Sequence, residues 1–111
     1  MKIFFIGSVL FSRILLEKLL KIDNINIVGI ATKSKSNFNS DHSDLSDLAQ
    51  NSHIPYKYIG DINKTETVKW INSLNPEIIF CFGWSSLIKK ELLESCKSGV
   101  IGYHPSLLPK N

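Results

Sequence analysis

His104 is the histidine whose position is best suited to chemistry. It follows the apolar run Gly99–Tyr103 and precedes Pro105, whose ring restricts the direction of the backbone. Ligands of open parallel sheets bind beyond the carboxyl ends of the strands, and His104 is predicted to stand at such an end. An imidazole there can stabilise a developing negative charge or exchange protons near neutral pH. The alternative is a structural histidine.

Two other predicted strand ends bring polar groups to the same edge. Gly7 and Ser8 follow the first apolar run, and residues 83–86 (G-W-S-S) follow a later one. Glycines there would let ligand atoms approach main-chain amides. Trp84 is either a ligand-stacking ring at a loop tip or a core aromatic. Gly7-Ser8 lacks the further glycines of a dinucleotide fingerprint, so its alternative is a tight strand-to-helix turn with Ser8 as the helix cap.

The remaining titratable groups carry weaker signals. His42 and His53 lie in or beside polar segments, so we expect both imidazoles to be solvated. Cys81 and Cys96 form no C-x-x-C pair and have no zinc-ligand spacing to other residues, so no metal site is predicted. Both are predicted to be buried thiols of a reducing compartment.

The order of apolar segments predicts the fold that positions these groups. Short apolar runs predict strands at 3–6, 25–31, 56–59, 77–82 and 99–103, and helical spacing predicts helices at 11–21, 44–51, 63–74 and 87–95. Strands that alternate with helices predict an α/β fold class, a Rossmann-like parallel sheet with flanking helices. Residues 33–41 are polar and are predicted to form a loop.

The sequence also predicts helix caps and an apolar side of the first helix. Ser43 or Asp41 is expected to cap the second helix. Asn63, with Glu66 three residues later, resembles a capping box at the start of the third. In the first helix, Phe11, Leu15, Leu19 and Ile22 recur at helical spacing, with Ile14 and Leu16 beside them, and the helix is predicted to be amphipathic.

Residues 105–111 follow the last predicted strand without a helix that could cover the sheet. A doubly wound sheet that stopped there would leave apolar surface bare. We therefore expect residues 1–111 to be the N-terminal portion of one longer domain, incomplete at its C-terminus.

The composition excludes several classes of protein. With 111 residues, 43% hydrophobic and 21% charged, the chain has the values of an ordinary globular domain. No apolar run approaches the roughly 18 residues that cross a bilayer, and the apolar start lacks a signal-peptide cleavage site, so a cytoplasmic location away from membranes is expected. Thirteen basic and ten acidic residues give a net charge of +3, which by itself gives little grip on nucleic acid.

The segment Gly99–Pro109 (G-V-I-G-Y-H-P-S-L-L-P) resembles the N-x-H-x-S-L-L-P signature of the 10-formyltetrahydrofolate-dependent formyltransferases. This family includes methionyl-tRNA formyltransferase, glycinamide ribonucleotide transformylase and the sugar N-formyltransferases. Other segments are similar to the family in the same order: Met1–Ser8, Ile54-Pro55, Asn75–Ile79 and Gly83–Ser85. The resemblance covers essentially the whole chain and implies an enzyme that transfers a one-carbon group.

The resemblance also implies roles for individual residues. His104 matches the family's catalytic histidine, which stabilises the oxyanion and handles protons while an amine attacks the formyl carbon. The loop that lines the pterin pocket of 10-formyltetrahydrofolate matches Gly83, Trp84, Ser85, Ser86, Leu87 and Ile88. The substrate-binding side of the site is assigned to Gly7, Ser8, Gly102 and Ser106.

Two departures from the family pattern limit this transfer. The family's asparagine, two residues before the histidine, helps to hold the formyl oxygen, and here that position is Gly102. Another group must therefore supply the missing donor. The family's catalytic aspartate would follow Asn111, so these residues alone are not expected to complete an active site.

Three functions are compatible with the sequence. The first is formyl transfer from 10-formyltetrahydrofolate to a primary amine of a small molecule, with a nucleotide-linked amino sugar favoured by the openings G-S-V-L-F-S and G-W-S. The second is formylation of methionyl-tRNA, which the weak basic excess does not favour. The third is a folate- or nucleotide-binding module without catalysis.

Overall fold

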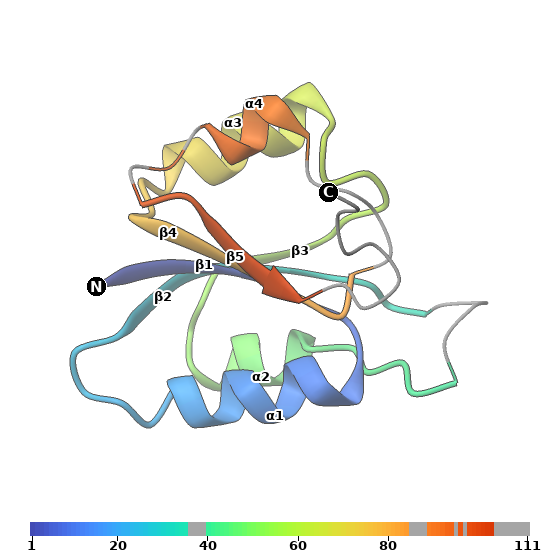
Figure 1. The fold of residues 1–111 in the computed structure, drawn as a ribbon. Coiled ribbons are helices and arrows are strands. Elements are labelled where there is room, and N and C mark those ends of the chain that lie inside the picture. The colour runs from blue at the N-terminus through green and yellow to red at the C-terminus, as the bar shows by residue number, and fades with distance from the viewer. Residues whose placement is uncertain (36–39, 85–88, 95, 97, 104–111) are drawn as a thin grey trace.

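Five parallel strands form one sheet in the order β3-β2-β1-β4-β5 (Figure 1). The computed structural model describes residues 1–35, 40–84, 89–94, 96 and 98–103. Within these, the strands are β1 (Lys2–Ile6), β2 (Asn26–Thr32), β3 (Tyr56–Tyr58), β4 (Ile78–Phe82) and β5 (Val100–Tyr103). The helices are α1 (Leu10–Leu19), α2 (Ser46–Asn51), α3 (Thr65–Ser73) and α4 (Lys90–Leu93). The predicted α/β, Rossmann-like fold is confirmed.

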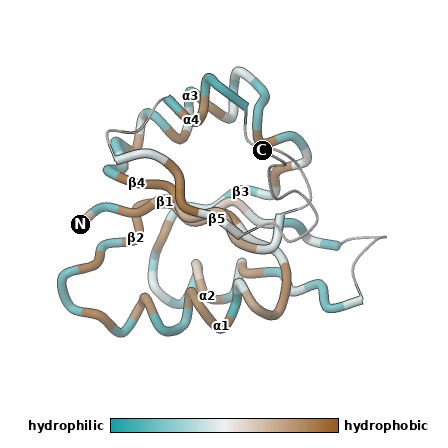
Figure 2. Tube along the Cα trace, viewed as in Figure 1, coloured by the Kyte–Doolittle hydropathy of each residue, from teal (hydrophilic) through white to brown (hydrophobic). Residues whose placement is uncertain are grey.

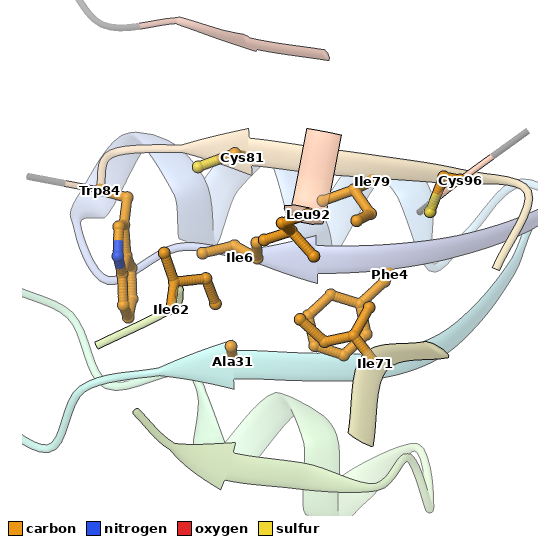
Figure 3. Packing of buried hydrophobic residues seen from close by; sticks show 10 residues of the cluster. All are labelled: Phe4, Ile6, Ala31, Ile62, Ile71, Ile79, Cys81, Trp84, Leu92 and Cys96. Carbon is orange, nitrogen blue, oxygen red and sulfur yellow. The ribbon is translucent and has the colours of Figure 1, made fainter. Parts of the chain in front are cut away.

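Helices cover both faces of the sheet. Helices α1 and α2 lie on one face, and α3 and α4 lie on the other (Figure 1). In Figure 2 the most apolar stretches of the sheet lie between these two helical layers. Side chains of the α3–α4 face include Phe4, Ile6, Ile71, Ile79 and Leu92 (Figure 3). Those of the α1–α2 face include Ile3, Phe5, Leu16, Ile30 and Leu45.

Strand β1 is the centre of both clusters. Its residues Ile3 to Ile6 are all fully buried, and they alternate between the two faces. A strand covered on both sides needs apolar side chains at every position, which explains the unbroken apolar run in the sequence. The carboxyl end of β1, which leads into the candidate residues Gly7 and Ser8, is therefore part of the core.

The core face of α1 includes only part of the predicted apolar set. The helix buries Ser12, Leu16 and Leu19, whereas Phe11 is 53% exposed and Ile22 is 45% exposed. Ser12 can be buried because its hydroxyl is paired within the helix start. It accepts a hydrogen bond from the Val9 N–H at 2.9 Å and donates to the Val9 carbonyl at 2.8 Å. Leu16 and Leu19 of the predicted apolar set thus face the core and Leu15 packs against it, whereas Phe11 and Ile22 do not.

The predicted helix caps are also wrong. Val9, not Ser8, is the N-cap residue of α1, while Leu45 and Lys64 occupy that position in α2 and α3. The Asn63 side chain instead accepts a hydrogen bond from the Lys89 N–H at 2.7 Å. A contact between distant segments thus replaces the predicted local one, and α3 begins two residues later than expected.

Candidate functional site

The strand ends singled out in the sequence meet at one edge of the sheet. Gly7 follows β1 and Gly83 follows the neighbouring strand β4, whose Cys81 pairs with Ile6. On the other side of β4, Phe82 pairs with Tyr103, the last residue of β5. The Ser8 hydroxyl donates a hydrogen bond to the Gly83 carbonyl at 3.4 Å. The turns after β1 and β4 are therefore in direct contact, and β5 ends beside them.

Part of the predicted site lies outside the described residues. This holds for the catalytic candidate His104, for Ser106, and for Ser85, Ser86, Leu87 and Ile88 of the loop after β4. Their roles stay predictions. The structure describes Gly7, Ser8, Gly83, Trp84 and Gly102 of that set.

Close packing explains why glycine occupies positions 7 and 83 at this edge. A Cβ atom on Gly7 would lie 2.4 Å from the Ser12 Cβ and 2.7 Å from the Phe82 carbonyl oxygen. On Gly83, which has φ +70°, it would lie 2.2 Å from Val9 Cγ2. Real Cβ atoms do not approach other atoms so closely, and a positive φ strains residues with side chains. Both positions thus require glycine for the strands and α1 to approach one another.

Trp84 belongs to the core rather than to an open loop tip. Its side chain is 3% exposed and lies beside Ile62 in the cluster on the α3–α4 face (Figure 3). The ammonium group of Lys33 sits over the ring, 4.6 Å from its centroid, which is cation–π distance. The buried indole N–H finds no hydrogen-bond acceptor within the described part of the chain. Of the two alternatives that the sequence left open for Trp84, its burial agrees with the core aromatic.

His42 is placed differently from the prediction. Both ring nitrogens are buried, and neither has a hydrogen-bond partner among the residues described. His42 pairs with Val9 in an isolated antiparallel bridge, so it lies against the turn between β1 and α1. The solvated imidazole expected here is therefore wrong, whereas His53 is exposed as predicted. Nothing in the polar segment around His42 signals this burial, because distant residues supply the covering atoms.

Arg13 also contacts the residues that follow His42. Arg13 on α1 donates to the Asp44 carbonyl at 3.3 Å and to Asp47 Oδ1 at 3.0 Å, and its other terminal nitrogen contacts Asp47 Oδ2. The hydrogen bond from Arg13 lowers the pKa of the Asp47 carboxyl. Burial raises the pKa of Asp44, but hydrogen bonds from Ser46 and Tyr58 outweigh it, and the net pKa is lowered. These carboxylates hold structure together around the site.

The whole sequence, residues 1–111, matches the formyl transferase family. This chain belongs to that family. The match agrees with the resemblance seen in the sequence and with the parallel sheet flanked by helices.

Individual relatives of the formyl transferase chain are named methionyl-tRNA formyltransferases. The protein of Thermotoga maritima is 27% identical over 99% of this chain and 36% of the relative. Identity is 33% with the Clostridioides difficile protein, over 99% of the chain and 37% of the relative. Identity with the Borreliella afzelii protein is 34%, over 99% of this chain and 35% of the relative. The chain thus spans a little over a third of the length of these relatives.

Gly102 is where this chain departs from the signature asparagine, and the structure gives a steric account. A Cβ atom at position 102 would lie 2.5 Å from the carbonyl oxygen of Cys81 on β4. The contacted atom is backbone, so a side chain would force β5 away from β4. Position 102 is therefore closed to asparagine in this arrangement of the two strands.

The cysteines of this formyl transferase domain are buried thiols, as predicted. Burial raises the pKa of the Cys81 thiol to about 12, so it stays protonated and unreactive near neutral pH. Among the described residues, no cluster of His, Cys, Asp and Glu side chains could hold a metal ion. No helix in the same residues combines the length and apolarity needed to cross a membrane.

Proposed function

We propose that this protein transfers a formyl group from 10-formyltetrahydrofolate to the amino group of methionyl-tRNA. The observation that carries the proposal is the match to the formyl transferase family over residues 1–111. The location of Gly7, Ser8 and Gly83 at the carboxyl edge of a parallel sheet supports it, because ligands of such sheets bind there.

The reaction requires a donor for the developing oxyanion. The amine nitrogen bonds to the formyl carbon, the bond from that carbon to N10 of the folate breaks, and N10 gains the proton that the amine loses. His104, as the match to the signature histidine, stabilises the oxyanion and assists this proton movement. The loop that begins at Gly83 and Trp84 holds the pterin ring of the donor, and Gly7, Ser8, Gly102 and Ser106 face the acceptor.

Methionyl-tRNA replaces the acceptor that the sequence first favoured. The openings G-S-V-L-F-S and G-W-S favoured a nucleotide-linked amino sugar, but the relatives are named methionyl-tRNA formyltransferases. The low basic charge does not oppose this choice, because this chain corresponds to little more than a third of those relatives. A basic surface for tRNA can belong to the remaining two-thirds.

An acceptor assay on the full-length protein tests the proposal. Purified enzyme with 10-formyltetrahydrofolate is offered methionyl-tRNA in one arm and a nucleotide-linked amino sugar in the other. We expect formylmethionyl-tRNA, and a loss of at least about a hundredfold in rate for His104→Ala. Product in the sugar arm alone would show that the acceptor is the amino sugar and not methionyl-tRNA, with formyl transfer still the reaction. Donor binding without product in either arm would indicate a folate-binding module.

A further inference from the structure

The side-chain polar atoms that are buried without a partner belong, in the described residues, to His42 and Trp84. Both residues lie at the carboxyl edge of the sheet: His42 pairs with Val9 of the turn that follows β1, and Trp84 follows Gly83 at the end of β4. Folded proteins pair nearly all buried polar groups, so such exceptions call for a functional explanation or a bound molecule. Trp84 already belongs to the predicted donor loop. His42 has no assigned role.

The position of His42 is fixed by main-chain hydrogen bonds on both sides. The Leu10 N–H donates to the Asp41 carbonyl at 2.9 Å, and the Ser43 N–H donates to the Ser8 carbonyl at 2.8 Å. Two residues further on, the Leu45 N–H donates to the Thr32 hydroxyl at 3.2 Å. The segment is thus tied to the turn after β1 and to the end of β2. Its imidazole is held at the site by this network.

The pairing also fixes the side on which the imidazole lies. The two hydrogen bonds flank Val9 and His42, which makes them directly opposed residues of an antiparallel bridge. Side chains of such a pair lie close together on the same face. The Val9 side chain points at Gly83, since its Cγ2 occupies the space of a Cβ atom there. His42 therefore lies on the side of the turn that faces the start of the loop after β4.

We infer that the His42 imidazole hydrogen-bonds a phosphate oxygen of the acceptor substrate. This inference rests on the proposed function. It adds to the acceptor side a residue from the segment between β2 and α2. A phosphate group is common to methionyl-tRNA and to a nucleotide-linked sugar, and its oxygens accept the hydrogen bonds that imidazole N–H groups donate. His42 also opposes the N-cap of the ten-residue helix α1, whose positive end favours an anion.

Steady-state kinetics of the full-length enzyme test the inference in both acceptor arms. His42→Leu removes both nitrogens at similar volume, and His42→Gln keeps a donor and an acceptor. For the leucine variant we expect the KM for the phosphate-bearing acceptor to rise roughly 10- to 100-fold, with kcat and the KM for the formyl donor nearly unchanged. The glutamine variant should recover part of the loss. The control is His53→Asn, which changes an exposed histidine and should leave all three constants alone.

Stability separates this role from a structural one. Because the His42 nitrogens have no hydrogen-bond partner among the described residues, leucine should leave the melting temperature equal to or above that of the wild type. Inorganic phosphate should raise the melting temperature of the wild type and of His53→Asn, and this rise should be lost in His42→Leu. An unchanged acceptor KM, or an equal phosphate effect in His42→Leu, overturns the inference.

The phosphate measurement does not require turnover. If the wild type binds phosphate through His42 but formylates neither acceptor, the proposed reaction is contradicted and the phosphate site is supported. A wild type that formylates methionyl-tRNA, with a KM that His42→Leu does not change, would contradict the site and keep the reaction.

Discussion

The turn after β1 and the end of β5 lie at the same edge of the sheet but are held in different ways. The turn contacts the 41–43 segment through two main-chain hydrogen bonds and contacts Gly83 through Ser8. Strand β5 pairs with β4 at the end of the strand order, and its Ile101 is 46% exposed. The turn after β1 is thus held by contacts from two segments, whereas β5, which ends at Tyr103, is held by its pairing with β4.

This difference predicts two kinds of mutational response. Substitutions at the turn should act mainly on stability, because the turn is part of the packed core. Substitutions between β4 and β5 should act on stability less and on catalysis more, because they shift the strand that carries the signature. Three variants test this division, in order of decreasing expected effect. Gly83 packs against Val9 of the turn, Gly102 lies on β5 against β4, and Asp47 contacts Arg13 of α1.

Gly83→Ala should give the largest loss of stability. The new methyl group would meet Val9 Cγ2 at 2.2 Å, and the residue would keep a positive φ. Overpacking and backbone strain each cost about 1–3 kcal/mol, so we expect the free energy of unfolding to fall by about 3–5 kcal/mol. Urea denaturation followed by circular dichroism measures this change.

Two other glycines separate the contributions to that loss. Gly99 has φ +86° with open space around its Cβ position, so Gly99→Ala tests strain alone. Gly60 has open space and no positive φ, so Gly60→Ala serves as the control. Equal losses for Gly83→Ala and Gly99→Ala would show that the contact with Val9 does not hold the turn.

Gly102→Asn should destabilise the protein less and should not improve catalysis. The Cβ atom would lie 2.5 Å from the Cys81 carbonyl oxygen, and β5 at the edge of the described sheet can shift to relieve this contact. We expect a loss of about 1–3 kcal/mol in the free energy of unfolding and a lower rate of formyl transfer, measured in the acceptor assay. A faster enzyme with the restored family asparagine would refute the steric account of Gly102, and Gly60→Asn controls for the asparagine itself.

The sheet could be predicted from sequence because its signals are local. Runs such as Ile3 to Ile6 are apolar at every position, and glycine marks the ends of β1 and β4. The number of possible strand orders is small, because crossover connections between parallel strands are right-handed in nearly all proteins. The meeting of the turns after β1 and β4 follows from this order, and the contact from Ser8 to Gly83 agrees with it.

The errors arose at polar side chains whose surroundings in the fold differ from those that the sequence pattern suggests. Asn63 has the spacing of a cap, yet its side chain pairs with Lys89. Ser12 has the sequence pattern of a surface residue of α1, yet it is buried through its bonds to Val9. His42 has the sequence pattern of a loop residue, yet it pairs with Val9 in a bridge and its ring nitrogens are buried. Short-range pattern cannot show such pairings, and a site built from several strand ends depends on them.

Asp47→Asn should give the smallest effect and a distinct pH dependence. Asp47 is about half exposed, and exposed ion pairs contribute little, so we expect a loss of about 0.5 kcal/mol at pH 7. Because Arg13 lowers the pKa of Asp47 in the folded state, this contribution is present above the unfolded pKa of about 4. It should disappear as the pH falls through the folded value, so that wild type and variant converge in urea denaturation at low pH.

Asp23→Asn is the matched control for this measurement, because it removes an exposed carboxylate outside the contact with Arg13. The small expected effect follows from the main-chain bonds that also hold residues 41–45. A loss above about 2 kcal/mol for Asp47→Asn would mean that the ion pair, and not the backbone network, fixes this segment. The position of His42 would then depend on the charge of Asp47, and acceptor affinity would fall together with stability at low pH.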